Sequence, residues 1–216
     1  KARSTDFWGS SVRMNELLRK ARKEGLPIYG AQYPYNTSGS DGRIVLIPFW
    51  ASTDDSSADS KTTEKNKHEQ PDYAKRLESV LADKNKAAEL RRDIKYEMTR
   101  RGGPDNILIV DHPNSDLVGQ SLSEFAARLE MDPVKAAISL QLTWDRTRRG
   151  GARLRAFSMS EKDVEAFAKT PWTATSSDAG ITLPNDGPVH PRFYGAFPRK
   201  IRRYAIERGL ISIEEA

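Results

Sequence analysis

Apolar residues recur along the chain in short runs that are separated by clusters of turn-forming residues. Residues 10–24 are amphipathic, which predicts a helix that ends at Gly25. The apolar residues near one face of this helix are Val12, Leu17, Leu18 and Ala21. A short apolar segment over residues 26–32 predicts a strand that leads into a turn-rich loop over residues 33–42. Helix, strand and loop in this order indicate an α/β fold with a parallel sheet.

The same pattern resumes beyond a polar stretch. Residues 52–70 contain Ser, Thr, Asp, Lys and Asn with almost no large apolar group, so we interpret them as a solvated insertion. Residues 73–100 have a helical pattern, and the β-branched run over residues 106–111 predicts the strongest strand of the chain. The insertion therefore interrupts the α/β pattern without ending it.

Helix starts and short strands fill the second half of the chain. Ser121 with Glu124 forms a predicted capping box, and Asp132 before Pro133 is a predicted N-cap. Ser160 is a third predicted N-cap, with Asp163 as its acidic partner in a further capping box. The remaining predicted elements are strands over residues 153–157 and 171–175, a loop to Pro198 and a basic helix over residues 200–208.

Three polar clusters fall at the carboxyl ends of predicted strands, which is where parallel α/β folds bind their ligands. They cover residues 33–40, 111–114 and 176–178. Asp178 is the sharpest candidate, because a carboxylate after a short apolar strand can bind a cation and accept a proton from water. The alternative is that Asp178 caps the turn that follows it.

Histidine is scarce, and no His-x-His motif occurs. His68 lies in the polar insertion and is predicted to be solvated, whereas His112 follows the strongest strand as a ligand or a loop residue. His190 precedes Pro191, which restricts its backbone to extended forms. One aspartate and scattered histidines do not make a closed metal site, so the residues alone do not contain a complete catalytic set.

Composition excludes several classes of protein. The 216 residues are 37% hydrophobic and 30% charged, and no apolar run approaches the roughly 20 residues that cross a bilayer, so no membrane partner is expected. The absence of cysteine excludes disulfides and thiol chemistry. The net charge of +5 is spread among acidic residues, and the basic run at 146–149 lacks interleaved aromatic residues, so no nucleic-acid partner is expected. The expected location is cytoplasmic, with a periplasmic or secreted one left open.

Residues 176–216 carry a long, ordered set of motifs, and three more lie upstream. The former are 177–180 (SDAG), 190–199 (HPRFYGAFPR), 203–204 (RY) and 209–216 (GLISIEEA), and the latter are 32–35 (QYPY), 119–122 (GQSL) and 157–164 (FSMSEKDV). In this order they resemble the D-aminoacylase, or N-acyl-D-amino-acid deacylase, family of the amidohydrolase superfamily. The resemblance covers nearly the whole chain except the insertion.

The resemblance implies a fold and an activity. Residues 1–216 would form the C-terminal half of a (β/α)8 TIM-type barrel, incomplete in this chain, with the remaining half supplied by a missing N-terminal segment or a separate chain. Members of such a family bind one or two zinc ions at the mouth of the barrel. They hydrolyse the amide bond of an N-acyl-D-amino acid to a D-amino acid and a carboxylate, so a small-molecule N-acyl amino acid is the expected substrate.

The resemblance also implies roles for individual residues. Asp178 matches the aspartate of the last barrel strand, which binds metal, acts as general base on the attacking water and then protonates the leaving amine. Lys1 and Tyr33 match residues that contact the substrate carboxylate, and a serine that shares this role is either Ser38 or Ser40. The alternatives are that Lys1 is a solvated end and that Tyr33 packs beside its proline neighbour.

Three further residues belong to the expected substrate site. Met159 matches a methionine that lines the acyl or side-chain pocket, with ordinary core packing as the alternative. His190 and Arg192 come from the HPR motif, and Arg192 and Arg199 are each either structural or a contact for acidic groups. The chain departs from the family at Ala179 and Ala196, where glycine and threonine are usual.

A second class of function stays open on the sequence. Because most of the expected metal ligands are missing, the chain is alternatively a catalytically incomplete amidohydrolase-like scaffold or a binding subunit. The two hypotheses differ in one respect that an experiment can measure, since only the enzyme requires stoichiometric zinc.

Overall fold

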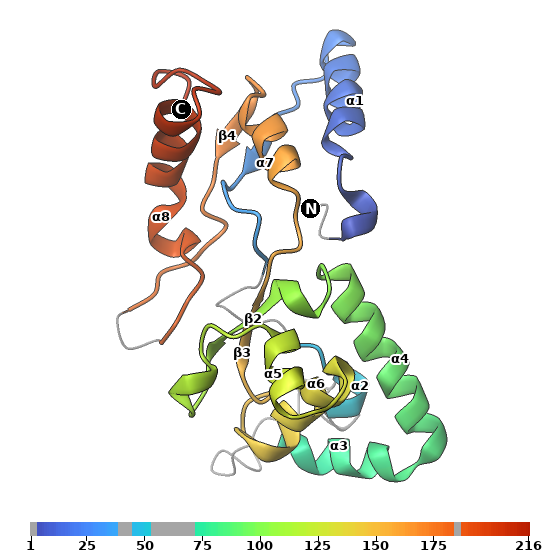
Figure 1. Ribbon diagram of the computed structural model, residues 1–216. Helices are drawn as coiled ribbons and strands as arrows, with labels where there is room; N and C mark the ends of the chain where they lie inside the picture. The colour runs from blue at the N-terminus through green and yellow to red at the C-terminus, as the bar shows by residue number, and fades with distance from the viewer. Residues whose placement is uncertain (1–3, 39–44, 53–71, 184–186) are drawn as a thin grey trace, which may run out of the picture. The chain divides into compact units, whose positions relative to one another are not determined.

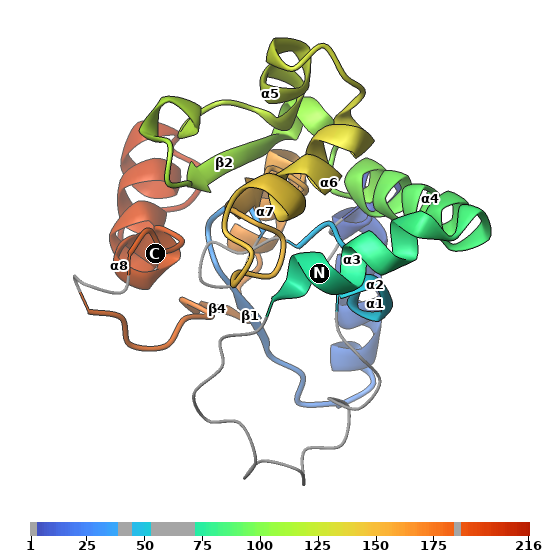
Figure 2. The ribbon, with the colours of Figure 1, turned by 90° about the horizontal axis from the view of Figure 1, so that it is seen from below.

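The structure is a computed structural model that describes residues 4–38, 45–52, 72–183 and 187–216. The chain divides into two compact units, shown as ribbons in Figures 1 and 2. The first unit combines Lys1–Asp41 with Phe157–Ala216, and the second is formed by Gly42–Ala156. The polypeptide therefore leaves the first unit beyond its first strand and returns to it more than a hundred residues later.

A parallel pair of strands lies at the centre of the first unit. Strand β1 (Gly30–Gln32) pairs with β4 (Thr173–Thr175), with Gly30 opposite Thr173. Helix α7 (Glu161–Ala168) contacts both strands and also α1 (Ser11–Lys23), as Figure 1 shows. Parallel strands need a crossover connection, so this unit has the α/β character that the sequence predicts.

The C-terminal part of the first unit contains one continuous helical segment. Helix α8 (Arg192–Arg199) continues directly into the π-helix η6 (Lys200–Glu207). The predicted loop up to Pro198 was therefore too long, because the helix already begins at Arg192 and contains Pro198. Tyr204 of η6 is fully buried against α7, and its hydroxyl donates to Glu161 Oε1 at 3.0 Å.

Helix α1 has the predicted bounds but not the predicted buried face. Val12 and Leu17 are 64% and 55% exposed, whereas Ser11 and Asn15 are buried. Asn15 connects α1 to the end of α7, because its Nδ2 donates to Ala166 O at 3.4 Å. The polar side of α1 thus packs within the unit, and the described residues leave much of its apolar side uncovered.

The start of α1 is held by a carboxylate from α7. Asp163 is buried and accepts hydrogen bonds from the backbone N–H groups of Gly9 (2.8 Å) and Ser11 (3.1 Å). The predicted capping box of Ser160 with Asp163 was wrong, since the Ser160 side chain makes no capping hydrogen bond. Asp163 instead satisfies N–H groups at the N-terminus of a different helix.

The second unit consists mostly of helices around one antiparallel strand pair. Its helices are α2 (Phe49–Ser52), α3 (Tyr73–Ala82), α4 (Lys84–Arg100), α5 (Leu122–Arg128) and α6 (Pro133–Thr143), and its short 3-10 turns are η3 (Pro104–Asn106) and η4 (Ser115–Leu117). Strands β2 (Ile107–Asp111) and β3 (Arg153–Ala156) pair antiparallel, with Ile107 opposite Ala156. The expectation of parallel pairing for the strongest predicted strand was wrong, because an apolar β-branched run is compatible with either direction.

The second unit has its own apolar core. It includes the fully buried side chains Leu77, Leu90, Ile94, Ile107, Ile109, Leu122 and Leu140. These residues come from α3, α4, α5, α6 and β2, and Figure 2 shows these elements gathered together. A core of this size is expected for a segment that folds as one unit.

Side-chain caps determine where the helices of this unit begin. The predicted helix over residues 73–100 is divided at Asp83, whose carboxylate accepts from the N–H groups of Asn85 and Lys86 and starts α4. The capping box of Ser121 and Glu124 is confirmed, with both reciprocal hydrogen bonds present.

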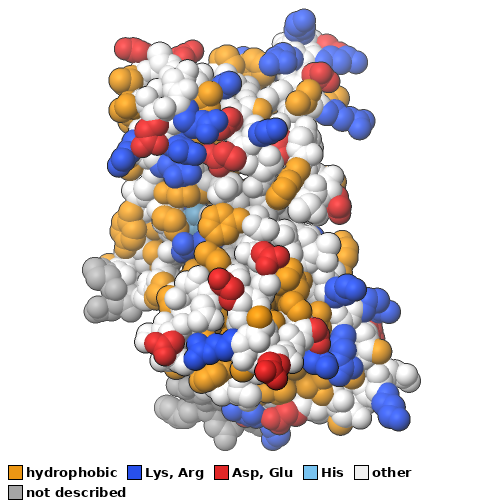
Figure 3. Space-filling view, viewed as in Figure 1, with side chains coloured by type: hydrophobic (Ala, Val, Ile, Leu, Met, Phe, Trp, Pro, Cys, Tyr) orange, Lys and Arg blue, Asp and Glu red, His pale blue; other side chains and the backbone are white. Residues whose placement is uncertain are grey.

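The charged surface has no single sign. Figure 3 shows Lys and Arg side chains interspersed with Asp and Glu on the visible face. Many pair directly, as in the contacts of Arg146 with Asp72 (3.0 Å) and Glu78 (2.9 Å). Within the described ranges, no helix is both long and apolar enough to cross a membrane.

Candidate active site

The loop that follows β1 is closed by its own hydrogen bonds and by a partner loop. Tyr33 is buried, and its hydroxyl donates to the backbone carbonyl of Thr37 at 3.0 Å. Ser38 is also buried, with its Oγ 2.6 Å from Ser158 Oγ. Met159 N donates to Asn36 O at 3.1 Å. The loop therefore lies directly beside the segment that carries Met159.

His190 is fully buried and bridges this loop to the start of α8. Its Nδ1 accepts from the backbone N–H of Arg192 at 3.0 Å, so in the neutral ring Nε2 carries the proton. That Nε2 lies 2.5 Å from Thr37 Oγ1. The ring also stands edge-on to Tyr33, with centroids 6.1 Å apart. Both nitrogens have protein partners, which suits a positioning role and leaves neither available to a metal.

Asp178 follows the end of β4 by three residues and forms an ion pair with Arg192. Arg192 Nη1 donates to Asp178 Oδ2 at 2.7 Å, and the two side chains are 7% and 44% exposed. Asp178 has a φ of +51°, in the left-handed region that non-glycine residues seldom adopt and that is often found at functional sites. The carboxylate is thus held at a strand end by a buried cation while it stays accessible.

Arg192 joins the carboxylate to the Tyr33 loop. Its guanidinium carbon lies 5.2 Å from the centre of the Tyr33 ring, a cation–π distance. Its Nε is buried and has no hydrogen-bond partner within the structure as described. Asp178, Arg192 and Tyr33 therefore form a contiguous group with one unsatisfied N–H donor, which costs free energy unless a ligand or water satisfies it.

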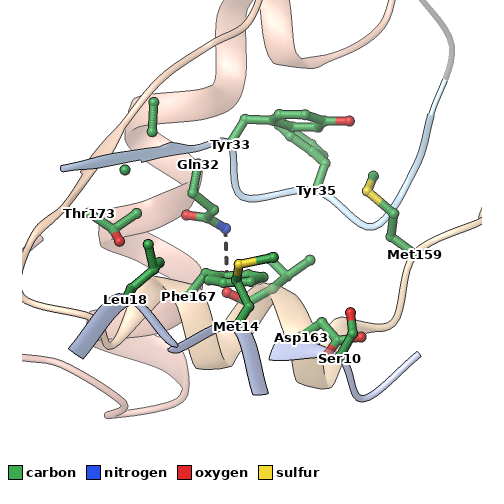
Figure 4. Close-up of a pocket in the computed structure, with 13 residues that line it drawn as sticks. Ser10, Met14, Leu18, Gln32, Tyr33, Tyr35, Met159, Asp163, Phe167 and Thr173 are labelled. Carbon is green, nitrogen blue, oxygen red and sulfur yellow. Dashed lines mark hydrogen bonds between the residues drawn. The ribbon is translucent and has the colours of Figure 1, made fainter. Parts of the chain in front are cut away.

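Tyr33 also lines a largely apolar cavity of about 300 Å³, which Figure 4 shows. Its apolar wall is formed by Met14, Leu18, Tyr33, Tyr35, Met159, Val164 and Phe167. Gln32 also lines the cavity, and its Nε2 donates to Val164 O at 3.4 Å while its buried Oε1 has no partner in the described part of the chain. The cavity has the size and lining of a site for a small apolar group.

Two groups of η6, which continues the helix that carries Arg192, have displaced pKa values. Burial lowers the pKa of the Lys200 ammonium below its ordinary value. Burial raises the pKa of the Tyr204 hydroxyl well above its usual range, and the negative charge of Glu161 adds to this effect. Tyr204 is therefore a hydrogen-bond donor at neutral pH.

The structure brings together most of the residues predicted for the site. Tyr33, His190, Arg192 and Asp178 lie in one connected network, Ser38 is bonded to Ser158 in the adjacent segment, and Met159 lines the cavity that Tyr33 also lines. Lys1 and Ser40 lie outside the described residues, as does His68.

The predicted cluster at residues 111–114 lies elsewhere. It follows the antiparallel strand β2 in the second unit, so it does not share the sheet edge of the other two clusters. His112 packs against Trp144 there, with ring centroids 4.4 Å apart, and its Nδ1 accepts from Asn114 N at 2.9 Å.

Several residues of the network were not predicted as site residues. Thr37 holds His190, Ser158 holds Ser38, and Tyr35 stands edge-on to His190 with centroids 5.2 Å apart. Tyr35 and Ser158 lie within the motifs, which was the available signal, whereas Thr37 is inconspicuous in a loop of turn formers.

The residues present do not form a zinc site by themselves. No group of three or more His, Cys, Asp or Glu side chains that could hold a metal occurs among the described residues. Asp178 offers a partly exposed carboxylate of the kind that zinc accepts, but a zinc site needs at least three protein ligands. The chain thus fits the metal as the source of one ligand.

Comparison with solved structures defines the class of the fold. The chain aligns over 99% of its length with the N-acyl-D-glutamate deacylase of Bordetella bronchiseptica, at 23% identity and a TM-score of 0.53. It aligns over 98% with a D-aminoacylase described as defining a novel subset of amidohydrolases, at 22% identity and a TM-score of 0.51. The match covers 31% of each of these chains, so the fold is that of part of such an amidohydrolase.

Comparison with curated sequences names the relatives more narrowly. The chain is 36% identical over 104 residues to the N-acyl-D-glutamate deacylase of Alcaligenes xylosoxydans xylosoxydans, and 33% identical over the same length to the D-aminoacylase of that organism. These matches cover 48% of the chain but 19% of each relative, so the chain spans about a fifth of their length. No family model matches. The resemblance to the D-aminoacylase family is confirmed.

Proposed function

We propose that the chain is the C-terminal part of the catalytic barrel of a zinc-dependent deacylase that hydrolyses N-acyl-D-amino acids. The curated relatives carry the names of two such deacylases, and one similar solved structure holds zinc and a phosphonate inhibitor. The zinc would polarise the substrate amide and activate the attacking water. Product release would give a D-amino acid and a carboxylate.

The observation that carries this proposal is the coupling of Asp178 to Arg192 and Tyr33. The carboxylate lies after a parallel strand, at the edge where α/β folds bind ligands. A buried arginine fixes one of its oxygens, and the same arginine lies over the tyrosine of the loop beyond the neighbouring strand. Three separate segments are therefore linked through one arginine, which contacts both the Asp178 carboxylate and the Tyr33 ring.

Each residue of the network has a proposed task. Asp178 accepts a proton from the attacking water and delivers it to the leaving amine. Tyr33, Arg192 and Ser38 orient the substrate carboxylate, and the unsatisfied Nε of Arg192 is a donor suited to an anionic oxygen. His190 fixes the position of Arg192 relative to Thr37 through its two hydrogen bonds.

Met159 and Lys1 complete the proposed substrate site. Met159 contributes to the cavity wall, so the cavity is the proposed position of an apolar part of the substrate, with a flexible thioether that adapts to shape. Lys1, outside the described residues, retains its proposed role as a point charge near the substrate carboxylate.

The remaining zinc ligands and barrel strands are proposed to come from polypeptide outside these residues. The described part of the first unit has a sheet of only two strands, and β1 pairs with β4 on one edge alone. A two-stranded parallel sheet is not independently stable, which supports a partner strand on the other edge of β1.

The complete protein, with the chain joined to or assembled with its missing strands, allows a direct test. We expect release of free D-amino acid from a panel of N-acetyl-D-amino acids, no comparable release from the L-enantiomers, and loss of turnover in Asp178→Ala with retained folding. Absence of hydrolysis of any member of both panels, in protein loaded with zinc, contradicts the proposal.

A scaffold or binding subunit is the second candidate, and the lack of a three-ligand set within the described ranges favours it. Elemental analysis of the purified complete protein distinguishes the two, because a scaffold has no need of stoichiometric zinc. One or two zinc ions per chain that are lost on Asp178→Ala favour the enzyme.

A further inference from the structure

Two motif residues without a task in the proposed chemistry, Gly195 and Arg199, meet Tyr35 of the cavity wall in the first unit. Tyr35 follows the proposed substrate tyrosine by two residues, and Gly195 and Arg199 lie on α8, about one turn apart. Their contacts involve the ring and hydroxyl of Tyr35, the backbone of Gly195 and the guanidinium of Arg199. They join the loop after β1 to the helix that carries Arg192.

The Tyr35 hydroxyl and the Arg199 guanidinium both make contacts between the loop and α8. Tyr35 Oη donates to Pro191 O at 3.3 Å, at the start of α8. At the other end of the helix, Arg199 Nε donates to Pro34 O at 2.5 Å, and its guanidinium carbon lies 4.8 Å from the centre of the Tyr35 ring. Tyr35 therefore contacts both ends of α8, and Pro34 adds a hydrogen bond at the second end.

Gly195 makes these contacts sterically possible. A Cβ placed on Gly195 would overlap the Tyr35 hydroxyl, while the next nearest atom, Tyr35 Cζ, would lie at an ordinary 3.7 Å. Gly195 has no positive φ, so the backbone itself does not require glycine. Glycine disfavours a helix interior relative to alanine, which leaves the close approach of one hydroxyl as the physical reason for glycine here.

We propose that Tyr35, Gly195 and Arg199 form an interlock that positions the active site, and this inference rests on the proposed function. Arg192 lies in the first turn of α8, and its guanidinium must cover Tyr33 while it holds Asp178. The interlock fixes the distance between α8 and the loop and so sets both contacts at once. Tyr35 also packs against His190, which is hydrogen-bonded to Thr37 of the loop and to Arg192 of α8. None of the three residues touches the reacting atoms, so they are positioning residues.

The test is a double-mutant cycle in the complete, zinc-loaded protein. Gly195→Ala adds a methyl group against the Tyr35 hydroxyl and displaces α8 from the loop, and Tyr35→Phe removes the overlapping atom. We expect Gly195→Ala alone to lower kcat/KM by about 10- to 100-fold, the range that sub-ångström to 1 Å displacements produce. We expect Gly195→Ala with Tyr35→Phe to recover to within about threefold of Tyr35→Phe alone, since the methyl group then meets only van der Waals neighbours.

A matched control exists on the same helix. Tyr194 is exposed, and its hydroxyl donates to Thr182 O at 3.3 Å, the same length as the Tyr35 bond. Tyr194→Phe should leave kcat/KM unchanged and should not rescue Gly195→Ala. All assays are performed where each variant is fully folded by circular dichroism, so that the separate values of kcat and KM report on the folded site.

The outcomes separate the interlock from the proposed function. Equal kcat/KM for Gly195→Ala and wild type, or a Gly195→Ala loss that Tyr35→Phe fails to reverse, overturns the interlock. If the wild-type protein is inactive on every substrate, the proposed function fails, while the rescue remains measurable as the urea midpoint of the same four proteins.

Discussion

The ion pair between Arg192 and Asp178 should respond unequally to loss of its two members. Arg192 is 7% exposed and Asp178 is 44% exposed. Loss of Asp178 therefore leaves a buried charge without its partner, whereas loss of Arg192 leaves a carboxylate that water can reach. Removing the partner of a buried charge costs about 3–5 kcal/mol, whereas losing an exposed pair costs about 0–1 kcal/mol. Asp178→Ala should therefore destabilise the first unit more than Arg192→Met does.

The surroundings of the ion pair give a narrower range for the loss of stability in each variant. In Asp178→Ala the arginine keeps its place over Tyr33 but loses the carboxylate that pairs with it, which predicts a cost of about 2–4 kcal/mol. In Arg192→Met the carboxylate rehydrates, and the thioether retains packing against the ring, which predicts about 1 kcal/mol. With a urea dependence of about 2 kcal/mol/M, Asp178→Ala should lower the unfolding midpoint by about 1–2 M.

Tryptophan fluorescence can report on this unit alone. Trp8 and Trp172 belong to the first unit, and Trp50 and Trp144 belong to the second, so replacing the latter pair by phenylalanine confines the signal. Urea unfolding of both single variants and the double variant then gives the coupling energy. A smaller loss for Asp178→Ala than for Arg192→Met, or a coupling within error of zero, refutes the reasoning.

Three other predictions concern single features. Burial lowers the pKa of His112 below its ordinary 6.5, so the unfolded chain takes up a proton more readily than the folded one. The second unit should therefore lose stability as pH falls from about 6.5. His112→Asn should flatten this part of the curve of unfolding free energy against pH, and an unchanged curve contradicts the prediction. Asp163→Ala leaves the N–H groups of Gly9 and Ser11 without their acceptor and should cost about 1–2 kcal/mol, with faster hydrogen exchange confined to the start of α1; uniform exchange across the unit argues against the cap. Gly151→Ala places a Cβ against the Leu140 carbonyl and should prevent the second unit from folding. Gly119→Ala, also at positive φ but in open space, should lower the free energy of unfolding by only about 1–2 kcal/mol. Similar melting temperatures for the two variants would contradict the steric argument.

Local signals in the sequence predicted the elements whose causes are local. The β-branched run at 106–111 is a strand, and the Ser121 and Glu124 side chains cap α5 reciprocally. The division at Asp83 was missed because an aspartate in a helical pattern either faces solvent or caps a new helix, and the pattern is the same.

Orientation and burial depend on residues far apart in the chain, and there the sequence was a poor guide. The apolar run of β2 does not reveal that its partner is antiparallel, and the amphipathic pattern of α1 does not reveal that Asn15 faces inward. These outcomes depend on tertiary packing, which overrides periodicity.

The candidate site shows the same division. The motifs identified Asp178, Tyr33 and Arg192 by resemblance, but the ion pair and the ring contact that join them are not contained in any spacing. Thr37 and His190 are 153 residues apart and share a hydrogen bond that no local pattern indicates. Motifs thus name residues, whereas the fold supplies their geometry.

Location of the metal in the complete protein tests the central claim most directly. Anomalous scattering at the zinc edge, from crystals of the complete protein grown with zinc, should place an ion about 2.0–2.2 Å from a carboxylate oxygen of Asp178, with Arg192 still bonded to that side chain. Crystals that contain zinc only at sites remote from Asp178, or none at full occupancy, contradict the account.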